Sequence, residues 1–233
     1  MDTRLQRLGG IAALSGFGAV AFQLFLYFVY IPSLGFSIND MNGDVQTRLR
    51  LLNAARTAFL WDGLILFAFF SFQFVLVHAL YVRLRDSAPV LSLLAAVFGY
   101  GSTALLVLEQ VRVYTLAKTV GKLISADQMT YVSPNTDFLR GMLENGSLLL
   151  NIPWIALVCI ASLRNRELTR PVAYLGILAA AWNVLIAVGV LPGGAGPNPP
   201  GTLLVIAVGV VLLVRPDPRR TRAVRPVAEP TTA

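Results

Sequence analysis

The chain has 233 residues, of which 56% are hydrophobic and only 13% are charged. Soluble globular domains carry about 25% charged residues, and a soluble domain this apolar would lack the polar surface that covers a core. The same composition excludes a disordered chain, and a single cysteine, Cys159, excludes a disulfide scaffold. The sequence therefore predicts an integral membrane protein.

Runs without Asp, Glu, Lys or Arg mark the predicted spans. A helix needs about 20 apolar residues to cross a hydrocarbon core of about 30 Å. The long runs cover residues 9–30, 63–82, 89–108, 145–163 and 171–214. The last run has 44 residues and folds at a Gly- and Pro-rich segment, so it predicts two spans.

We therefore predict an all-α bundle of six transmembrane helices within residues 1–214. The first apolar run exceeds the roughly 7–15 residues of a signal-peptide core, so we expect it to remain as a helix. The sixth helix is the shortest, because its apolar run covers only residues 202–214. The expected spans lie at about residues 9–31, 59–82, 89–113, 143–163, 171–191 and 200–214.

The basic residues predict the orientation of the bundle. With six spans, twelve of the nineteen basic residues fall on the side that holds both termini, and seven fall on the other side. The positive-inside rule places the richer side in the cytoplasm. The nineteen comprise 17 Arg and 2 Lys, a bias that we take to indicate a GC-rich bacterium. The expected location is the bacterial cell (cytoplasmic) membrane, with both termini cytoplasmic.

Residues 215–233 predict a disordered basic cytoplasmic tail. They combine five arginines with four prolines and show no apolar periodicity. Beside a membrane, such a segment attracts anionic lipid headgroups at about 1 kcal/mol per basic residue. The lipid bilayer and these headgroups are therefore the expected partners, and nucleic acid is not.

The predicted first outer loop contains an amphipathic pattern. Leu49, Leu52, Ala55 and Phe59 recur at helical spacing. This pattern predicts a stretch that lies at the interface or extends the second helix outward.

The second outer loop, residues 114–142, is expected to be structured as well. The third helix is predicted to overshoot the membrane as far as residue 124, and a capping-box spacing at residues 125–128 predicts a short helix. The Ser- and Pro-containing segment 133–137 is expected to break the chain before the fourth helix.

Ionisable residues inside the predicted spans fall at one depth. Such residues are costly in a bilayer and suggest a functional site. Asp62, Glu109 and Glu144 each lie near the outer end of the second, third or fourth span, and Arg112 lies one turn from Glu109. Tyr27 is among the aromatic residues that flank this level, as part of an aromatic belt or of a binding wall.

Helical phase extends this cluster into the membrane. Gln73, Ser102 and Asn151 lie seven or eleven residues from the three acids on their own helices, and therefore on nearly the same faces. The candidate binding pocket consists of Asp62, Glu109, Arg112, Glu144, Asn151, Gln73 and Ser102. A structural ion-pair network explains the same pattern about equally well.

The sequence leaves three classes of function open. The first is binding or transport of a small molecule or lipid through an outward-facing polar pocket. The second is an integral-membrane enzyme that uses Asp62 and Glu109 as acid and base on an isoprenoid or lipid. The third is a non-catalytic partner or regulatory subunit. A stripe of small residues suits close helix packing, either within the bundle or between protomers, and such a subunit would use it together with the basic tail; the stripe is Ala12, Ser15, Gly16 and Ala19.

Neither a cofactor nor a metal site is expected. His78 is the sole histidine, which excludes haem or zinc sites built on histidine pairs, and we expect it to be buried with a backbone partner. Cys159 is interpreted as a small apolar residue within a span. The sequence contains no Walker loop, GxSxG, HExxH or CxxC motif.

The order of these parts resembles an uncharacterised family of six-helix bacterial membrane proteins, a domain of unknown function. The resemblance rests on a short basic segment at residues 4–10, an acid in the third helix, Glu109, and a basic, proline-containing loop at residues 168–176 that ends in Leu-Gly. It implies a six-helix fold and no particular activity.

Overall fold

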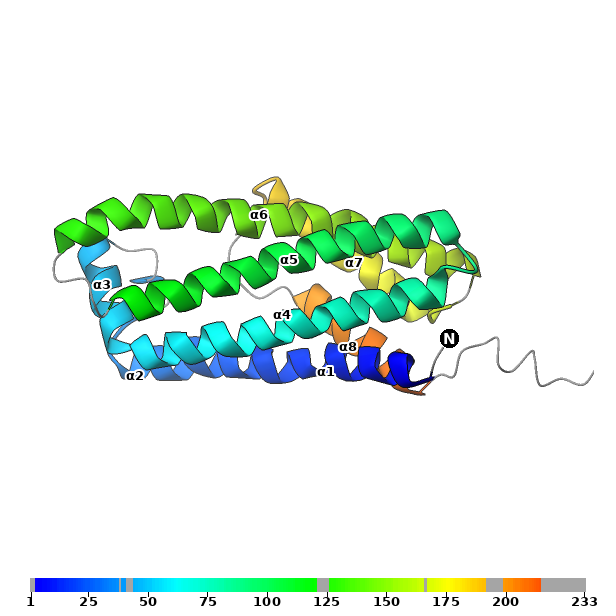
Figure 1. The fold of residues 1–233 in the computed structure, drawn as a ribbon, viewed down its shortest axis with the longest axis horizontal. Coiled ribbons are helices and arrows are strands. Elements are labelled where there is room, and N and C mark those ends of the chain that lie inside the picture. The colour runs from blue at the N-terminus through cyan, green and yellow to red at the C-terminus, as the bar shows by residue number, and fades with distance from the viewer. Residues whose placement is uncertain are drawn as a thin grey trace, which may run out of the picture.

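The structure is a computed structural model that describes residues 3–37, 39–40, 44–120, 126–165, 167–191 and 199–214. Every regular element among these residues is helical (Figure 1). The first helical rod combines α1 (Thr3–Phe25), a π-helical turn η1 (Leu26–Tyr30) and α2 (Ile31–Ser33). The remaining helices are α3 (Val45–Ala54), α4 (Arg56–Leu84), α5 (Pro89–Val120), α6 (Ala126–Asn165), α7 (Arg170–Ala187) and α8 (Pro199–Val214).

Five helices are long and apolar enough to cross a membrane. Within their apolar windows no more than 39% of the residues are buried, and large side chains such as Phe17, Leu108 and Leu149 are exposed. A soluble bundle would cover such faces, whereas lipid solvates them. The structure therefore supports a multi-pass membrane protein. The five helices are Arg4–Ser33, Arg56–Leu84, Pro89–Val120, Asp137–Asn165 and Arg170–Ala187.

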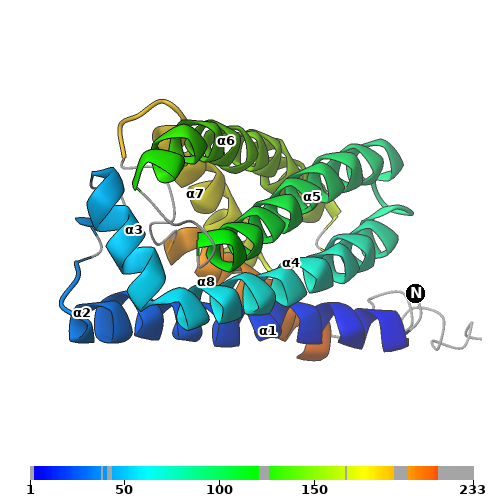
Figure 2. The same cartoon turned by 60° about the vertical axis from the view of Figure 1, so that its left-hand side comes forward.

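The helices form a closed ring. From α4 to α8, each helix packs against its neighbour in chain order (Figure 2). The ring closes because α1 packs against both α8 and α4. The main buried cluster, which includes Leu76, Val158, Ala179 and Leu212, fills the part of the ring that α7 and α8 complete. These two helices are shorter than the other four.

Glycines allow α1 and α8 to approach closely. A Cβ atom on Gly209 would lie 2.9 Å from the Ala13 Cβ and 3.1 Å from the Gly10 carbonyl oxygen. A Cβ on Gly10 would in turn lie 2.6 Å from the Leu213 Cγ. Small residues that bring two backbones together are the usual contact between membrane helices.

The small-residue stripe of α1 is used inside the bundle. Gly16 packs against the Phe69 ring of α4, and Gln73 of α4 donates a hydrogen bond of 3.3 Å to the Ala12 carbonyl. Ala12 and Ala19 are buried. Of the two uses that the sequence left open for this stripe, the structure shows contact within the bundle.

The segment predicted as the first outer loop forms a separate helix, α3, and does not extend α4. Asp44 caps α3 by accepting a hydrogen bond of 2.8 Å from the Thr47 backbone N–H. The helix ends at Ala55, whose φ and ψ of −102° and 16° break the path into α4. Leu51, Ala55 and Phe59 form the α3 and α4 side of a second buried cluster.

The π-helical turn completes this second cluster from the first rod. Leu26 and Ile31 are both buried, although they are five residues apart. In a regular α-helix such residues point about 140° apart. In η1 the Ile31 N–H donates to the Leu26 carbonyl, so five residues make about one turn and both side chains face the cluster.

The fourth predicted span begins earlier than expected. Residues 133–137 do not break the chain, because α6 continues through them from Ala126 to Asn165. Pro134 lies inside the helix at an exposed position. Because proline has no backbone N–H, the carbonyl four residues earlier loses its helical donor, and water can bond to that carbonyl instead. The predicted overshoot of the third span agrees with α5 as far as Val120.

Several predicted features lie outside the described residues. They are the end of that overshoot at residues 121–124, most of the Gly- and Pro-rich turn, and the tail at residues 215–233.

At the end of the bundle that carries the first helical residues, a buried ion pair joins a helix to a loop. The Arg83 Nη2 donates a hydrogen bond of 2.9 Å to the Glu167 carbonyl, and the Arg83 Nε lies 3.8 Å from a Glu167 carboxylate oxygen. Both side chains are nearly inaccessible, at 1% and 7% exposed. The pair ties the end of α4 to the connection between α6 and α7.

Candidate functional site

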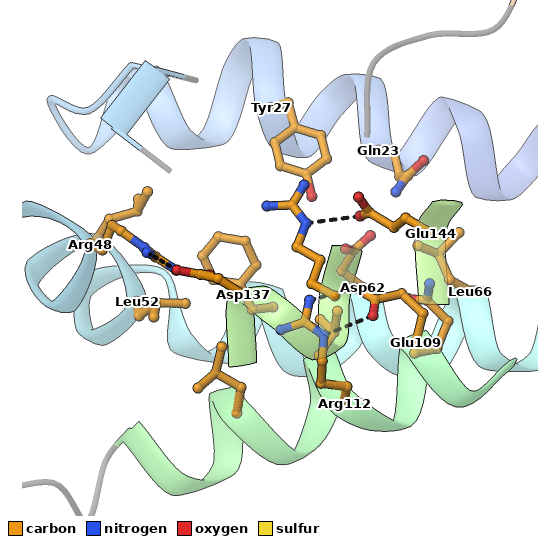
Figure 3. Close-up of a pocket in the computed structure, with 16 residues that line it drawn as sticks. Gln23, Tyr27, Arg48, Leu52, Asp62, Leu66, Glu109, Arg112, Asp137 and Glu144 are labelled. Carbon is orange, nitrogen blue, oxygen red and sulfur yellow. Dashed lines mark hydrogen bonds and ion pairs between the residues drawn. The ribbon is translucent and has the colours of Figure 1, made fainter. Parts of the chain in front are cut away.

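The opposite end of the bundle contains a cavity of about 120 Å³. Its walls come from the first rod and from α3, α4, α5 and α6, which places it beneath α3 (Figure 3). Leucines, Phe59 and Val113 supply apolar lining. Seven charged residues also line it, namely Arg48, Asp62, Glu109, Arg112, Asp137, Arg140 and Glu144.

Two of the acids pair with arginines of their own helix. The Arg112 Nε donates to a Glu109 carboxylate oxygen at 2.8 Å, and the Arg112 Nη2 donates to the other oxygen. Arg140 donates to Glu144 at 2.9 Å, one turn away on α6. Pairs at these spacings form readily on a helix. Both carboxylate oxygens of Glu109 are therefore occupied.

A third ion pair crosses the mouth of the cavity. Arg48 of α3 holds Asp137 of α6 through two parallel hydrogen bonds of 2.8 and 2.7 Å (Figure 3). This fork is the geometry in which arginine binds carboxylates most firmly. The two residues are 89 positions apart in the chain, and their pairing fastens α3 over the cavity.

Asp62 is the acid left over. It is 2% exposed and takes part in no ion pair among the residues that the structure describes. Gln23 and Tyr27 lie close enough to hydrogen-bond its carboxylate, but the buried Oδ1 atom has no hydrogen-bond partner. Four acids line the cavity against three arginines, and Asp62 is the acid without an arginine.

A second unpartnered acceptor lines the same cavity. Gln110 of α5 is 6% exposed, and its Oε1 atom is buried without a hydrogen-bond partner. Buried acceptors without donors cost about 1–3 kcal/mol each. Two of them in one cavity therefore point to a donor that occupies the space between the helices.

Tyr27 is an aromatic wall residue of the cavity. It lies in the π-helical turn, one turn after Gln23, and both side chains line the cavity. Single π-helical turns inside α-helices occur often at functional sites. Of the two roles predicted for Tyr27, the structure shows a wall of the cavity.

The structure brings together four of the seven predicted site residues, Asp62, Glu109, Arg112 and Glu144. Gln73, Ser102 and Asn151 do not line the cavity. Ser102 donates to the Ser147 carbonyl at 2.9 Å, and Gln73 bonds to α1 as described above.

Asn151 accepts from the amide of Asn183 at 3.0 Å. The three deeper polar residues, Gln73, Ser102 and Asn151, therefore bond directly to a neighbouring helix and not to the cavity.

Sequence reasoning missed several wall residues. Arg48 and Asp137 lie in predicted loops, where no periodicity indicates that they pair. Gln23 and Gln110 are polar residues within or beside predicted spans, a signal that was available. The polar and aromatic lining residues absent from the predicted site are Gln23, Tyr27, Arg48, Phe59, Gln110, Asp137 and Arg140.

Cys159 and His78, which the sequence analysis placed outside the candidate pocket, do not line the cavity. Cys159 is buried in the main cluster, as expected for a small apolar residue. His78 is not buried with a backbone partner. It is exposed, and its Nδ1 lies 2.9 Å from the Tyr100 hydroxyl of α5. The aromatic hydroxyl on the neighbouring helix satisfies the ring without burial.

Among the described residues, no three His, Cys, Asp or Glu side chains gather as a metal site would require. Comparison of the chain with family models, curated proteins and solved structures finds no match. The candidate function therefore rests on the cavity itself.

Proposed function

We propose that this multi-pass membrane protein binds or transports a small molecule through the cavity beneath α3, and that the cavity faces the outer side of a bacterial cell membrane. The observation that carries the proposal is Asp62, a buried carboxylate without an ion-pair partner that lines a cavity whose other acids are all paired. A purely structural network would leave no such group uncompensated, because an unpaired buried charge is costly.

The size of the cavity favours a small solute over a lipid chain. About 120 Å³ is the volume of roughly four water molecules in the liquid. Pockets for larger organic ligands enclose about 300–1,000 Å³.

The proposed orientation requires that α8 is the sixth span. Its 16 residues reach about 24 Å, which is short of a full hydrocarbon core. Its close contact with the beginning of α1 supports a place within the membrane, where local thinning accommodates short spans. Six crossings put both termini on the basic, cytoplasmic side, and α3 then lies outside.

The enzymatic alternative is reduced to one acid. Arg112 donates to both oxygens of Glu109, so of the two predicted acids Asp62 is the one that no arginine among the described residues holds. An enzyme of this kind would convert its ligand, whereas a binding protein or transporter would return it unchanged.

Native mass spectrometry of the gently extracted protein tests the proposal. The wild type is compared with Asp62→Asn, which keeps the shape of the side chain, and with Asp86→Asn, an exposed acid at the far end of the bundle. We expect a defined small solute on the wild type and on Asp86→Asn that is lost from Asp62→Asn. Equal spectra containing only bulk phospholipid would contradict the proposal, and a chemically altered solute would indicate the enzyme.

A further inference from the structure

We infer that the ligand of the cavity is a small monocation that carries N–H donors, with a primary ammonium group as the simplest case. This inference rests on the proposed function and specifies the chemistry of its ligand. It follows from the charge balance, the unpartnered acceptors and the aromatic walls of the cavity.

The charge balance selects one positive charge. Glu109, Glu144 and Asp137 each hold an arginine, and Asp62 alone is left with an unbalanced charge. Water can hydrogen-bond to a carboxylate but cannot cancel its charge, and a buried charge without a counter-charge is strongly unfavourable. An anion would meet arginines that are already paired with acids, and a dication would leave an excess of positive charge.

The unpartnered acceptors select a donor. The Asp62 Oδ1 and the Gln110 Oε1 are both buried, both lack a donor, and both residues line the cavity. An ammonium group supplies three N–H donors from one atom, so it offers donors to more than one acceptor. A quaternary ammonium carries the charge but has no N–H, and it would leave both acceptors unsatisfied.

The remaining walls suit the body of such a ligand. Tyr27 and Phe59 line the cavity from the first rod and from α4, and aromatic side chains attract cations at their ring faces. Leu51 and Leu66 complete an apolar side that fits a short alkyl chain.

A matched set of probes tests this inference on the full chain in phosphatidylcholine nanodiscs, whose headgroups offer no N–H donor. The probes are propylammonium, tetramethylammonium, butyramide and butyrate. They separate the positive charge, the donors and the size of the ligand. Isothermal titration measures their affinities. We expect propylammonium to bind at least about tenfold more tightly than any of the other three, because it alone combines a positive charge with N–H donors and so forms the stronger, charge-assisted hydrogen bonds.

Two variants connect the binding to the named atoms. Asp62→Asn should weaken propylammonium binding by about tenfold to a hundredfold and abolish the preference over butyramide. Gln110→Met, which keeps the length of the side chain and removes the acceptor, should weaken it by a smaller factor. Asp86→Asn should bind like the wild type. Gel filtration and thermal unfolding of each variant identify any that fail to fold, and Gln110→Met provides a test if Asp62→Asn is among them.

The outcomes separate this inference from the proposed function. Tight binding of butyramide or butyrate, or equal binding of tetramethylammonium, would overturn the inference and leave a binding function intact. Absence of binding by all four probes would also overturn it, while the solute found by native mass spectrometry would still test the function. Propylammonium binding that survives both Asp62→Asn and Gln110→Met would place the cation elsewhere and overturn it too.

The same ammonium chemistry occurs in free amines and in phosphatidylethanolamine headgroups. Replacing part of the phosphatidylcholine with phosphatidylethanolamine distinguishes these two sources. If the lipid lowers the apparent affinity for propylammonium in the wild type, the headgroup is the ligand. An unchanged affinity identifies a soluble amine.

Discussion

The two ends of the bundle bury charge in different ways. At the end that carries the first helical residues, Arg83 of α4 pairs with Glu167 of the α6–α7 connection, and both side chains are buried beside the main cluster. At the α3 end, seven charged residues surround a cavity, and one carboxylate has no ion-pair partner. Buried charge alone therefore does not indicate function. The informative feature is an imbalance of charge next to empty space.

The comparison predicts which end is more sensitive to substitution. A buried pair inside close packing should be costly to break, whereas an exposed pair over a cavity should matter less for stability and more for access. Four changes test this contrast.

The largest expected effect is at the buried pair. Arg83→Gln leaves the Glu167 carboxylate without its arginine and should lower the free energy of unfolding by about 3 kcal/mol or more. Arg85→Gln, next to it in the chain but about half exposed, should change stability by less than about 1 kcal/mol. Unfolding in mixed micelles of increasing denaturing detergent measures both. Equal effects of the two substitutions would remove the contrast between the ends.

The α1–α8 contact should be nearly as sensitive. Gly209→Ala places a methyl group 2.9 Å from the Ala13 Cβ and should lower the free energy of unfolding by about 1–3 kcal/mol. Gly18→Ala on α1 meets no atom within 4 Å and should be neutral or stabilising by up to about 1 kcal/mol, because alanine favours the helix. The same unfolding assay compares them, and a neutral Gly209→Ala would show that α8 is not packed closely on α1.

The pair at the mouth of the cavity should contribute little to stability. Arg48 and Asp137 are 18% and 44% exposed, so Asp137→Asn should cost about 1 kcal/mol or less. It should, however, increase hydrogen exchange of the α3 amides, because it removes a link between α3 and α6. Exchanging the two residues, as Arg48→Asp with Asp137→Arg, should restore the slower exchange. Unaltered exchange in Asp137→Asn would show that other contacts hold α3.

The smallest effect concerns the beginning of α3 and depends on pH. The hydrogen bond from the Thr47 backbone N–H lowers the pKa of the Asp44 carboxyl below its ordinary value. The charged cap therefore stabilises α3 fully above the ordinary pKa of an aspartate, and this stabilisation is lost as the pH falls through the lowered pKa. NMR of the α3 amides during an acid titration should show fraying at low pH. Asp44→Asn, which caps without titrating, should remove the pH dependence, and an identical titration of this variant would assign it to another group.

The class of the protein could be predicted from composition because membrane spans need only length and apolarity. The shared depth of the four charged residues of the predicted site that line the cavity could also be predicted, because each lies near the end of its helix. What could not be predicted is whether the deeper polar groups point into the cavity or toward a neighbouring helix. Gln73, Ser102 and Asn151 share the phase of the acids, but whether a stripe meets a cavity or a neighbouring helix depends on how the helices converge.

The covering helix illustrates a second limit. The apolar spacing of residues 45–59 indicates an amphipathic helix, but the break at Ala55 depends on packing against Leu26 and Ile31 from a distant part of the chain. The continuity of α6 through Pro134 is similar, since a local breaker signal is overcome on an exposed turn of a long helix. Long-range packing bears on the first case and exposure to water on the second, and a single sequence contains neither in readable form.

The π-helical turn has a consequence for the first helical rod as a whole. The turn η1 holds one residue more than an α-helical turn. The residues after it therefore face other directions than they would if α1 continued as a regular helix. If residues 26–30 instead continued the regular α-helix with no residue lost, everything beyond them would rotate by about 100°. Ile31 would then leave its cluster, while Gly10 would stay against α8. The two halves of this rod can therefore be adjusted separately, one for assembly of the bundle and the other for the shape of the cavity.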